Sequence, residues 1–241
     1  MLGMPDRRKH RGANPQDQRL FADGRLADLR SAAADLAWLL SRGYAPPSSV
    51  KLVGDRHALT ARQRTAVQRA TCDDQALERR LIAMLPVSAI AGHEVAIDGY
   101  NLLITIEAAM AGGVILAGRD GTFRDLASVH GSYRSMDETL PALKLIGRAL
   151  TELGASGVWW ALDAPVSNSG RLRQRMLRLA ARHGWNWSVE LLANPDKALI
   201  ADDRPVITSD SAILDGCTAW VNLARHIVET YIQDAWIVDA S

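Results

Sequence analysis

The sequence is poor in cysteine and has no long apolar segment. Its 241 residues include two cysteines, Cys72 and Cys217, too few and too far apart for a disulfide framework or a zinc site. No apolar run reaches the roughly 18–20 residues that a membrane-spanning helix needs. The basic first residues lack the apolar segment of a secretory signal. We therefore expect a cytoplasmic protein with no membrane partner.

The small net charge of +1 hides an uneven distribution. Residues 1–90 contain 15 Lys and Arg against 9 Asp and Glu, whereas residues 91–241 contain 13 against 18. Positive charge suits a phosphate backbone, and clustered carboxylates suit divalent cations. The distribution predicts two parts with different tasks.

The first part is predicted to be helical. Residues 1–18 show no hydrophobic periodicity and are interpreted as a flexible basic tail. Residues 19–88 form the predicted helical, basic domain, with helices over residues 20–40, 48–56, 61–70 and 74–84 and with Ser48 and Thr60 as N-caps. The pair 48–56 and 61–70 leaves three interpretations open: a DNA-reading helix-turn-helix, contact with RNA or phosphate, and packing against the second part.

The second part, residues 91–241, alternates short apolar runs with helical segments. Strands are expected at residues 95–97, 157–162, 185–192, 206–207 and 218–221, with a further apolar run at 114–117. Helices are expected at residues 102–111, after Asp137, and at 169–183. This alternation predicts an α/β fold with a mostly parallel sheet and helices on both faces.

Four aspartates follow the predicted strands. They are Asp98, Asp163, Asp196 and Asp210. The carboxyl ends of parallel strands share one edge of the sheet, so the four acids are predicted to converge there. Converged carboxylates repel one another, and a cation such as Mg²⁺ would compensate them. Each aspartate could instead cap its own helix, and that alternative stays open.

The segment Ile97-Asp98-Gly99-Tyr100-Asn101 resembles the opening motif of the NYN branch of the PIN-like ribonucleases. Leu162-Asp163, Asp196-Lys197 and residues 206–210 resemble the later acidic motifs of that group. The resemblance implies RNA cleavage with Mg²⁺ or Mn²⁺ held by the four aspartates, and with Asn101 orienting the first carboxylate. It also implies a homodimer, since PIN-like domains often pair. The whole chain further resembles an uncharacterised prokaryotic family that joins a helical segment to such a part.

Two features depart from the motif pattern: the loop at residues 163–170 is longer and more polar, and the acidic turn at residues 120–125 has no counterpart. Further candidates for substrate binding are Ser167, Asn168, Ser169, Lys197, Ser209, Arg124 and His130. The first three could hold a phosphate or simply cap a helix. RNA is favoured over DNA as the partner. A non-catalytic nucleic-acid-binding regulator and a phosphohydrolase of small substrates remain alternatives.

Overall fold

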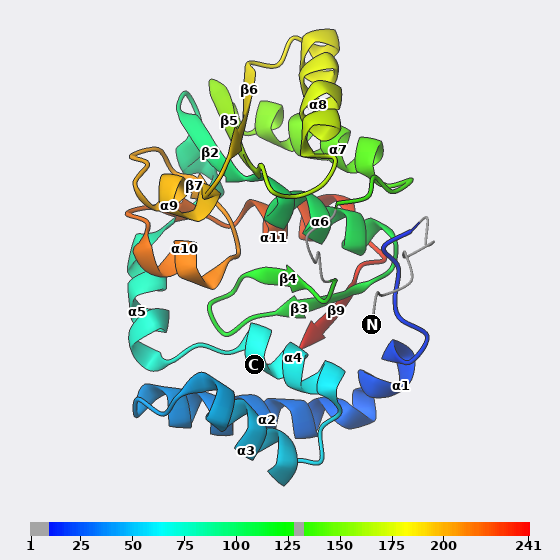
Figure 1. Cartoon of the computed structure of the whole chain (residues 1–241), viewed down its shortest axis with the longest axis vertical. Helices are drawn as coiled ribbons and strands as arrows, with labels where there is room; N and C mark the ends of the chain where they lie inside the picture. The colour runs from blue at the N-terminus through cyan, green and yellow to red at the C-terminus, as the bar shows by residue number, and fades with distance from the viewer. Residues whose placement is uncertain (1–9, 128–132) are drawn as a thin grey trace.

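A six-stranded parallel sheet forms the centre of the protein. The computed structural model describes residues 10–127 and 133–241. The strand order across the sheet is β1-β8-β7-β2-β5-β6 (Figure 1). The strands span Met84–Leu85 (β1), Glu94–Asp98 (β2), Gly157–Asp163 (β5), Trp187–Leu192 (β6), Val206–Ile207 (β7) and Trp220–Val221 (β8). The predicted α/β architecture with a parallel sheet is therefore confirmed.

Helices cover both faces of this sheet. Successive side chains of a strand point to opposite faces, so the apolar strands place buried side chains on both of them. Val95 and Ile97 of β2 belong to a large apolar cluster, whereas Ala96 between them belongs to another. The large cluster lies under α6 (Gly99–Met110), α7 (Thr139–Glu152), α8 (Ser169–His183) and α11 (Leu223–Tyr231). The smaller one lies under α9 (Pro195–Ile200) and α10 (Ser211–Gly216).

The central strand β2 is the point where the chain changes direction across the sheet. After β2 the chain builds β5 and β6 on one side, and it then returns to place β7 and β8 on the other. In open parallel sheets, ligands bind beyond the carboxyl ends of the strands at such a switch point. The fold therefore indicates a ligand site among the residues that follow β2 and β7.

A second, three-stranded sheet joins the N-terminal helices to the rest. It consists of β4 (Phe123–Asp125), β3 (Val114–Ala117) and β9 (Trp236–Asp239). Its buried side chains share one core with α2 (Asp23–Ser41), α3 (Pro46–Arg56) and α4 (Ala61–Ala70). Val238 and Ala240, in and just after β9, lie in that core with Leu29 and Leu36. The proposed boundary near residue 90 thus separates parts that pack closely together.

Several details of the N-terminal half differ from expectation. Residues 10–18 are no flexible tail: Arg11 pairs with buried Glu107, and buried Asp17 in α1 (Asp17–Leu20) pairs with Arg62. Proline at the start of α3 moves its N-cap to Ala45, so Ser48 does not cap it. The Thr60 cap is confirmed, and it is part of a capping box.

The start of one further helix agrees with the prediction, and another shifts by one residue. Helix α5 (Asp74–Ala83) begins at Asp74 as expected, with Asp73 as its N-cap. Helix α7 starts after Glu138, so Asp137 does not cap it. None of the helices in residues 10–127 and 133–241 combines the length and apolarity that a bilayer crossing requires.

Candidate active site

The four aspartates predicted from the sequence lie beyond the carboxyl ends of four neighbouring strands. Asp98 ends β2 and Asp163 ends β5, while Asp196 and Asp210 begin the helices that follow β6 and β7. Ala96 and Ala161 belong to the apolar cluster under α9 and α10. Asp98 and Asp163 each come two residues later, so the alternation directs their side chains to the same face.

Asp98 is the central residue of this group. Its side chain makes no cap to α6, although it precedes that helix, and only 8% of the residue is exposed. The Thr208 hydroxyl donates a hydrogen bond of 2.9 Å to Asp98 Oδ2. Burial, together with the charges of Asp210 and Asp196, raises the pKa of Asp98 to about 7, although the Thr208 hydroxyl and the Asn101 backbone act in the opposite direction. The fold therefore holds a carboxylate where ionisation is costly.

Asp98 differs from the other buried carboxylates because it has no cationic partner within the part of the chain that the structure describes. Each of the others has an arginine within 4 Å. The pairs are Asp17 with Arg62, Glu107 with Arg11, Asp125 with Arg69, and Asp120 with Arg80 and Arg124. Burying a charge without a compensating partner costs free energy, so Asp98 is the buried carboxylate that a bound cation would stabilise.

Asp163 and Asp196 share the electrostatic environment of Asp98. Burial raises the pKa of Asp163, and the charge of Asp196 adds to the shift. Burial also raises the pKa of Asp196, with a contribution from Asp210. Neither forms an ion pair within residues 10–127 and 133–241. The acids are therefore close enough to repel one another.

Asp210 has a structural role in addition. Its Oδ1 accepts hydrogen bonds from the backbone N–H groups of Ala212 (2.8 Å) and Ile213 (3.4 Å), so it caps α10. In the described residues, no three His, Cys, Asp or Glu side chains are grouped tightly enough to hold a metal ion. A cation here would depend on one or two carboxylates, with water and phosphate oxygens completing its shell.

Asn101 connects α6 to the loop after β7. Its Oδ1 accepts hydrogen bonds from the Ser209 backbone N–H (2.8 Å) and hydroxyl (2.9 Å). The resemblance implied that the Asn101 side chain orients the Asp98 carboxylate. In the structure the Thr208 hydroxyl has that position instead. Ser209 is 3% exposed and its N–H and hydroxyl both bind Asn101, so it has a structural role, and substrate binding by Ser209 stays a prediction.

Arg124 also has a structural role in place of the expected contact with substrate. It is buried, and its two terminal nitrogens bind Asp120 at 2.9 and 2.6 Å. Its Nε donates to the Ser209 carbonyl at 2.7 Å. The acidic turn thus supports the loop that carries Thr208.

Arg80 of α5 completes this support, and no sequence pattern predicts this role. It binds Asp120 at 2.6 Å and holds both oxygens of Asp215. The partners are 40 and 135 residues away in sequence. Long-range pairs of this kind leave no local pattern that could predict them.

The loop before α8 provides the next three candidates. Ser167 and Asn168 are exposed, while Ser169 is 5% exposed and donates to the Ala164 carbonyl at 3.4 Å. Asn168 has a left-handed φ of +70° and donates to the Tyr133 carbonyl at 3.1 Å instead of capping α8. Ser167 and Asn168 remain accessible to a substrate; Ser169 stabilises the loop.

Two further candidates have different outcomes. Lys197 is exposed on α9 next to Asp196, and its ammonium makes no ion pair with any described residue. His130 lies outside the residues that the structure describes.

Tyr100 is a residue that the sequence analysis did not single out. Its hydroxyl is buried and interacts with the Ser169 side chain, although no described residue offers it a hydrogen bond of good geometry. Burial raises its pKa and the charge of Asp163 adds to this, while Ser169 acts in the opposite direction. Its position between Asp98 and Asn101 in the motif was the available signal. Tyr100 therefore connects the motif to the loop that carries Ser169.

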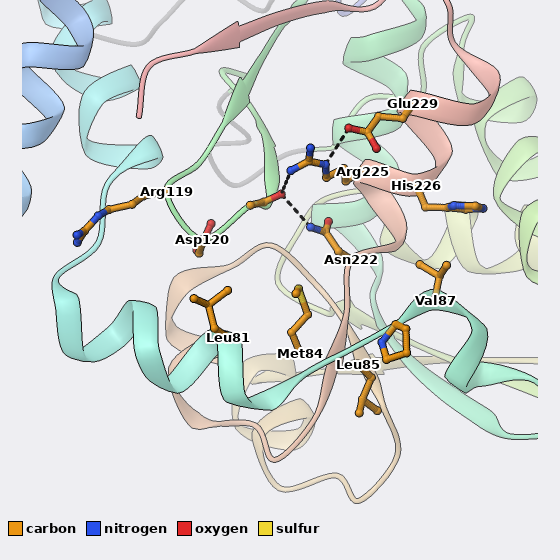
Figure 2. A pocket seen from close by; sticks show the side chains of 12 residues that line it. Leu81, Met84, Leu85, Val87, Arg119, Asp120, Asn222, Arg225, His226 and Glu229 are labelled. Carbon is orange, nitrogen blue, oxygen red and sulfur yellow. Dashed lines mark hydrogen bonds and ion pairs between the residues drawn. The ribbon is translucent and has the colours of Figure 1, made fainter.

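A cavity of about 480 Å³ lies at another part of the same sheet edge, beyond β1 and β8. Figure 2 shows Leu81, Met84 and Leu85 on one wall and Arg225 on the other. Arg225 is bound to Glu229 and to the Gly121 carbonyl. None of the four aspartates lines this cavity. We assign the active site to the aspartates because they carry uncompensated charge, which the cavity lacks.

Comparison with known proteins identifies the family but no activity. The model described as a domain of unknown function, DUF5616, matches residues 87–226, and one described as a protein of unknown function, DUF434, matches residues 28–81. An uncharacterised protein of Methanocaldococcus jannaschii is 27% identical over 186 residues, which cover 77% of this chain and 88% of that relative. No solved structure matches the chain. Because the first match covers more than half of the sequence, the chain belongs to the DUF5616 family.

Proposed function

We propose that this protein is a metal-dependent phosphodiesterase that cleaves RNA at the site around Asp98. The observation that carries the proposal is the buried Asp98 carboxylate, which has no cationic partner among the described residues and is repelled by the charges of Asp196 and Asp210. A divalent cation would relieve the repulsion among these groups. Such an ion activates water and stabilises the charge that develops on a phosphate during displacement.

The topology supports the same assignment. From β2, the five main strands of the sheet follow the order 3-2-1-4-5, and Asp98 and Thr208 flank the switch point between the first and fourth of them. The resemblance to PIN-like NYN ribonucleases depends on residues of this same edge. Position and motif therefore agree on one site.

The residues present fit a Mg²⁺ or Mn²⁺ ion. Oxygen ligands suit both ions, and the carboxylate of Asp98 with that of Asp163 or Asp196 would hold one. Water and a phosphate oxygen of the substrate would complete the shell. Lys197 would contact the substrate from α9, and the exposed Ser167 and Asn168 from the loop before α8.

Labelled RNA tests the proposal. Purified protein is incubated with single-stranded RNA in Mn²⁺, Mg²⁺ or EDTA, and the wild type is compared with Asp98→Asn. We expect cleavage that requires a divalent ion and that falls by about 100-fold or more in the variant. The matched control is Asp28→Asn, an exposed aspartate on α2 that should leave cleavage unchanged.

Equal cleavage by the wild type and Asp98→Asn would identify a contaminant and refute the proposal. A chromogenic phosphodiester tested in parallel separates the substrate classes. Turnover of this small substrate with no RNA cleavage would support a phosphohydrolase of small molecules. RNA binding without turnover in any metal would support a regulator.

A further inference from the structure

Helix α8 carries a row of arginines along one flank. The helix spans Ser169–His183 and contains five arginines and no acidic residue. Four of them, Arg171, Arg175, Arg178 and Arg182, are spaced by three or four residues and are exposed. At this spacing their side chains lie above one another on the helix. The row runs for about 16 Å at the helical rise of 1.5 Å per residue.

These arginines differ from most others in the protein because none of them forms an ion pair within residues 10–127 and 133–241. Arginines elsewhere, such as Arg62, Arg148 and Arg225, are paired with carboxylates. Within the row, Arg175 donates to the Ser135 hydroxyl at 2.5 Å. The other three are left with their guanidinium groups facing solvent.

The row begins at the edge of the sheet that carries the candidate active site. Helix α8 follows β5 after the short loop that starts at Asp163, so Arg171 lies near the carboxyl edge of the sheet. From there the helix extends away from α9 and β7, at the top of Figure 1. The first turn of α8 and the aspartates thus lie at one edge of the sheet, with α8 covering one face and α9 and α10 the other.

We propose that this flank of α8, defined by Arg171, Arg175, Arg178 and Arg182, binds the phosphate backbone of single-stranded RNA and leads it to Asp98. The proposal takes its ligand from the proposed nuclease function. Guanidinium groups bind phosphates in a bidentate fashion, and a row of them is suited to successive phosphates of one strand. A strand on this flank would neutralise the arginines, while the cation at Asp98 neutralises the acids.

The test is a binding measurement that does not depend on cleavage. A fluorescein-labelled oligouridine RNA is titrated with the full chain in EDTA, and anisotropy is recorded at several salt concentrations. The variant is Arg171→Gln/Arg178→Gln/Arg182→Gln, which leaves the Ser135 contact of Arg175 intact. The matched control is Arg19→Gln/Arg56→Gln/Arg79→Gln, three exposed arginines of the N-terminal helices.

We expect the α8 variant to bind RNA at least about tenfold more weakly at moderate salt, because each lost phosphate contact also removes about 0.7 from the log–log salt slope on a single strand. The slope should therefore fall by about 2. The control should bind RNA like the wild type. Both variants should keep the thermal midpoint of the wild type, since the substituted side chains are exposed.

The proposal is overturned if the α8 variant binds RNA as tightly as the wild type, or if the control loses as much affinity. The same proteins are also titrated with vesicles of phosphatidylcholine and phosphatidylserine. The proposal is overturned if the α8 variant binds these vesicles more weakly than the wild type does but binds RNA equally well. Cleavage by Asp98→Asn remains a separate measurement, so the RNA path and the nuclease function can fail independently.

Discussion

Asp120 and Asp98 are both buried aspartates, but arginines compensate the charge of Asp120 and not that of Asp98. Asp120 lies between the guanidinium groups of Arg80 and Arg124, which hold its pKa far below the usual range despite its burial. Asp98 has a hydroxyl and no cation, and its pKa rises to about 7. The two sites are connected, since Arg124 also binds the Ser209 carbonyl next to Thr208.

The difference separates a structural acid from a functional one. Removing a carboxylate from water costs several kcal/mol, and a paired arginine returns much of that cost. The fold supplies such arginines to Asp17, Glu107 and Asp120. No arginine pairs with Asp98 among the described residues, and this is the difference on which the proposed cation site rests.

The largest expected effect concerns the paired site. Arg80→Met leaves Asp120 with one arginine and removes both bonds to Asp215, so we expect a loss of about 3–5 kcal/mol in the free energy of unfolding. Urea unfolding measures it. The matched control is Arg79→Met, the exposed neighbour, which should change stability by less than about 0.5 kcal/mol. Similar stabilities for the two variants would contradict the structural role of Asp120.

Substitution of Asp98 is expected to increase the free energy of unfolding, whereas Arg80→Met decreases it. Its folded pKa is raised, so the wild type is penalised above pH 7, and the penalty disappears as pH falls below the unfolded value near 4. In EDTA, Asp98→Asn should therefore gain about 2–4 kcal/mol relative to the wild type between pH 4 and pH 8. Thermal unfolding at both pH values measures this. A pH-independent difference would show that Asp98 is compensated in some other way.

A divalent ion should remove this difference. At 100 times its dissociation constant, Mn²⁺ or Mg²⁺ stabilises a protein by about 2.7 kcal/mol if only the folded state binds it. We expect the wild type and Asp28→Asn to gain stability in Mn²⁺, and Asp98→Asn to gain little. Differential scanning fluorimetry gives the shifts. Equal shifts in all three proteins would mean that the ion binds elsewhere.

The smallest effect separates the two roles of Asp210. Asp210→Ala removes the cap of α10 and should cost about 1 kcal/mol. Asn is as good a cap as Asp, so Asp210→Asn should keep the stability but weaken the Mn²⁺-dependent gain. If Asp210→Asn responds to Mn²⁺ like the wild type, Asp210 is a cap and takes no part in the cation site.

The main sheet could be predicted because its strands are buried on both faces and therefore appear as short continuous apolar runs. The β2 and β5 runs show this, and their terminal aspartates follow from the same pattern. The run at residues 114–117 looked similar, yet it pairs with β4 and β9 in the second sheet. No local sequence feature distinguishes a strand of the main sheet from a strand of the second sheet.

Other elements gave a weaker signal or none. Strand β1 has two residues, and β9 pairs with a strand more than 100 positions earlier, so neither was predicted. Helix α11 was also missed. At the site, the position of Asp98 was predictable from its strand, but the partners of Asn101 and Arg124 were not, because they depend on how distant loops meet.

The location of β9 has a consequence for biosynthesis. Val238 and Ala240 fill the core under α2 and α4, although those helices are synthesised long before β9. These helices must expose apolar surface until β9 has left the ribosome, unless a chaperone covers it. A chain that lacks β9 should therefore aggregate, even though every residue of the proposed active site precedes β9 in the sequence.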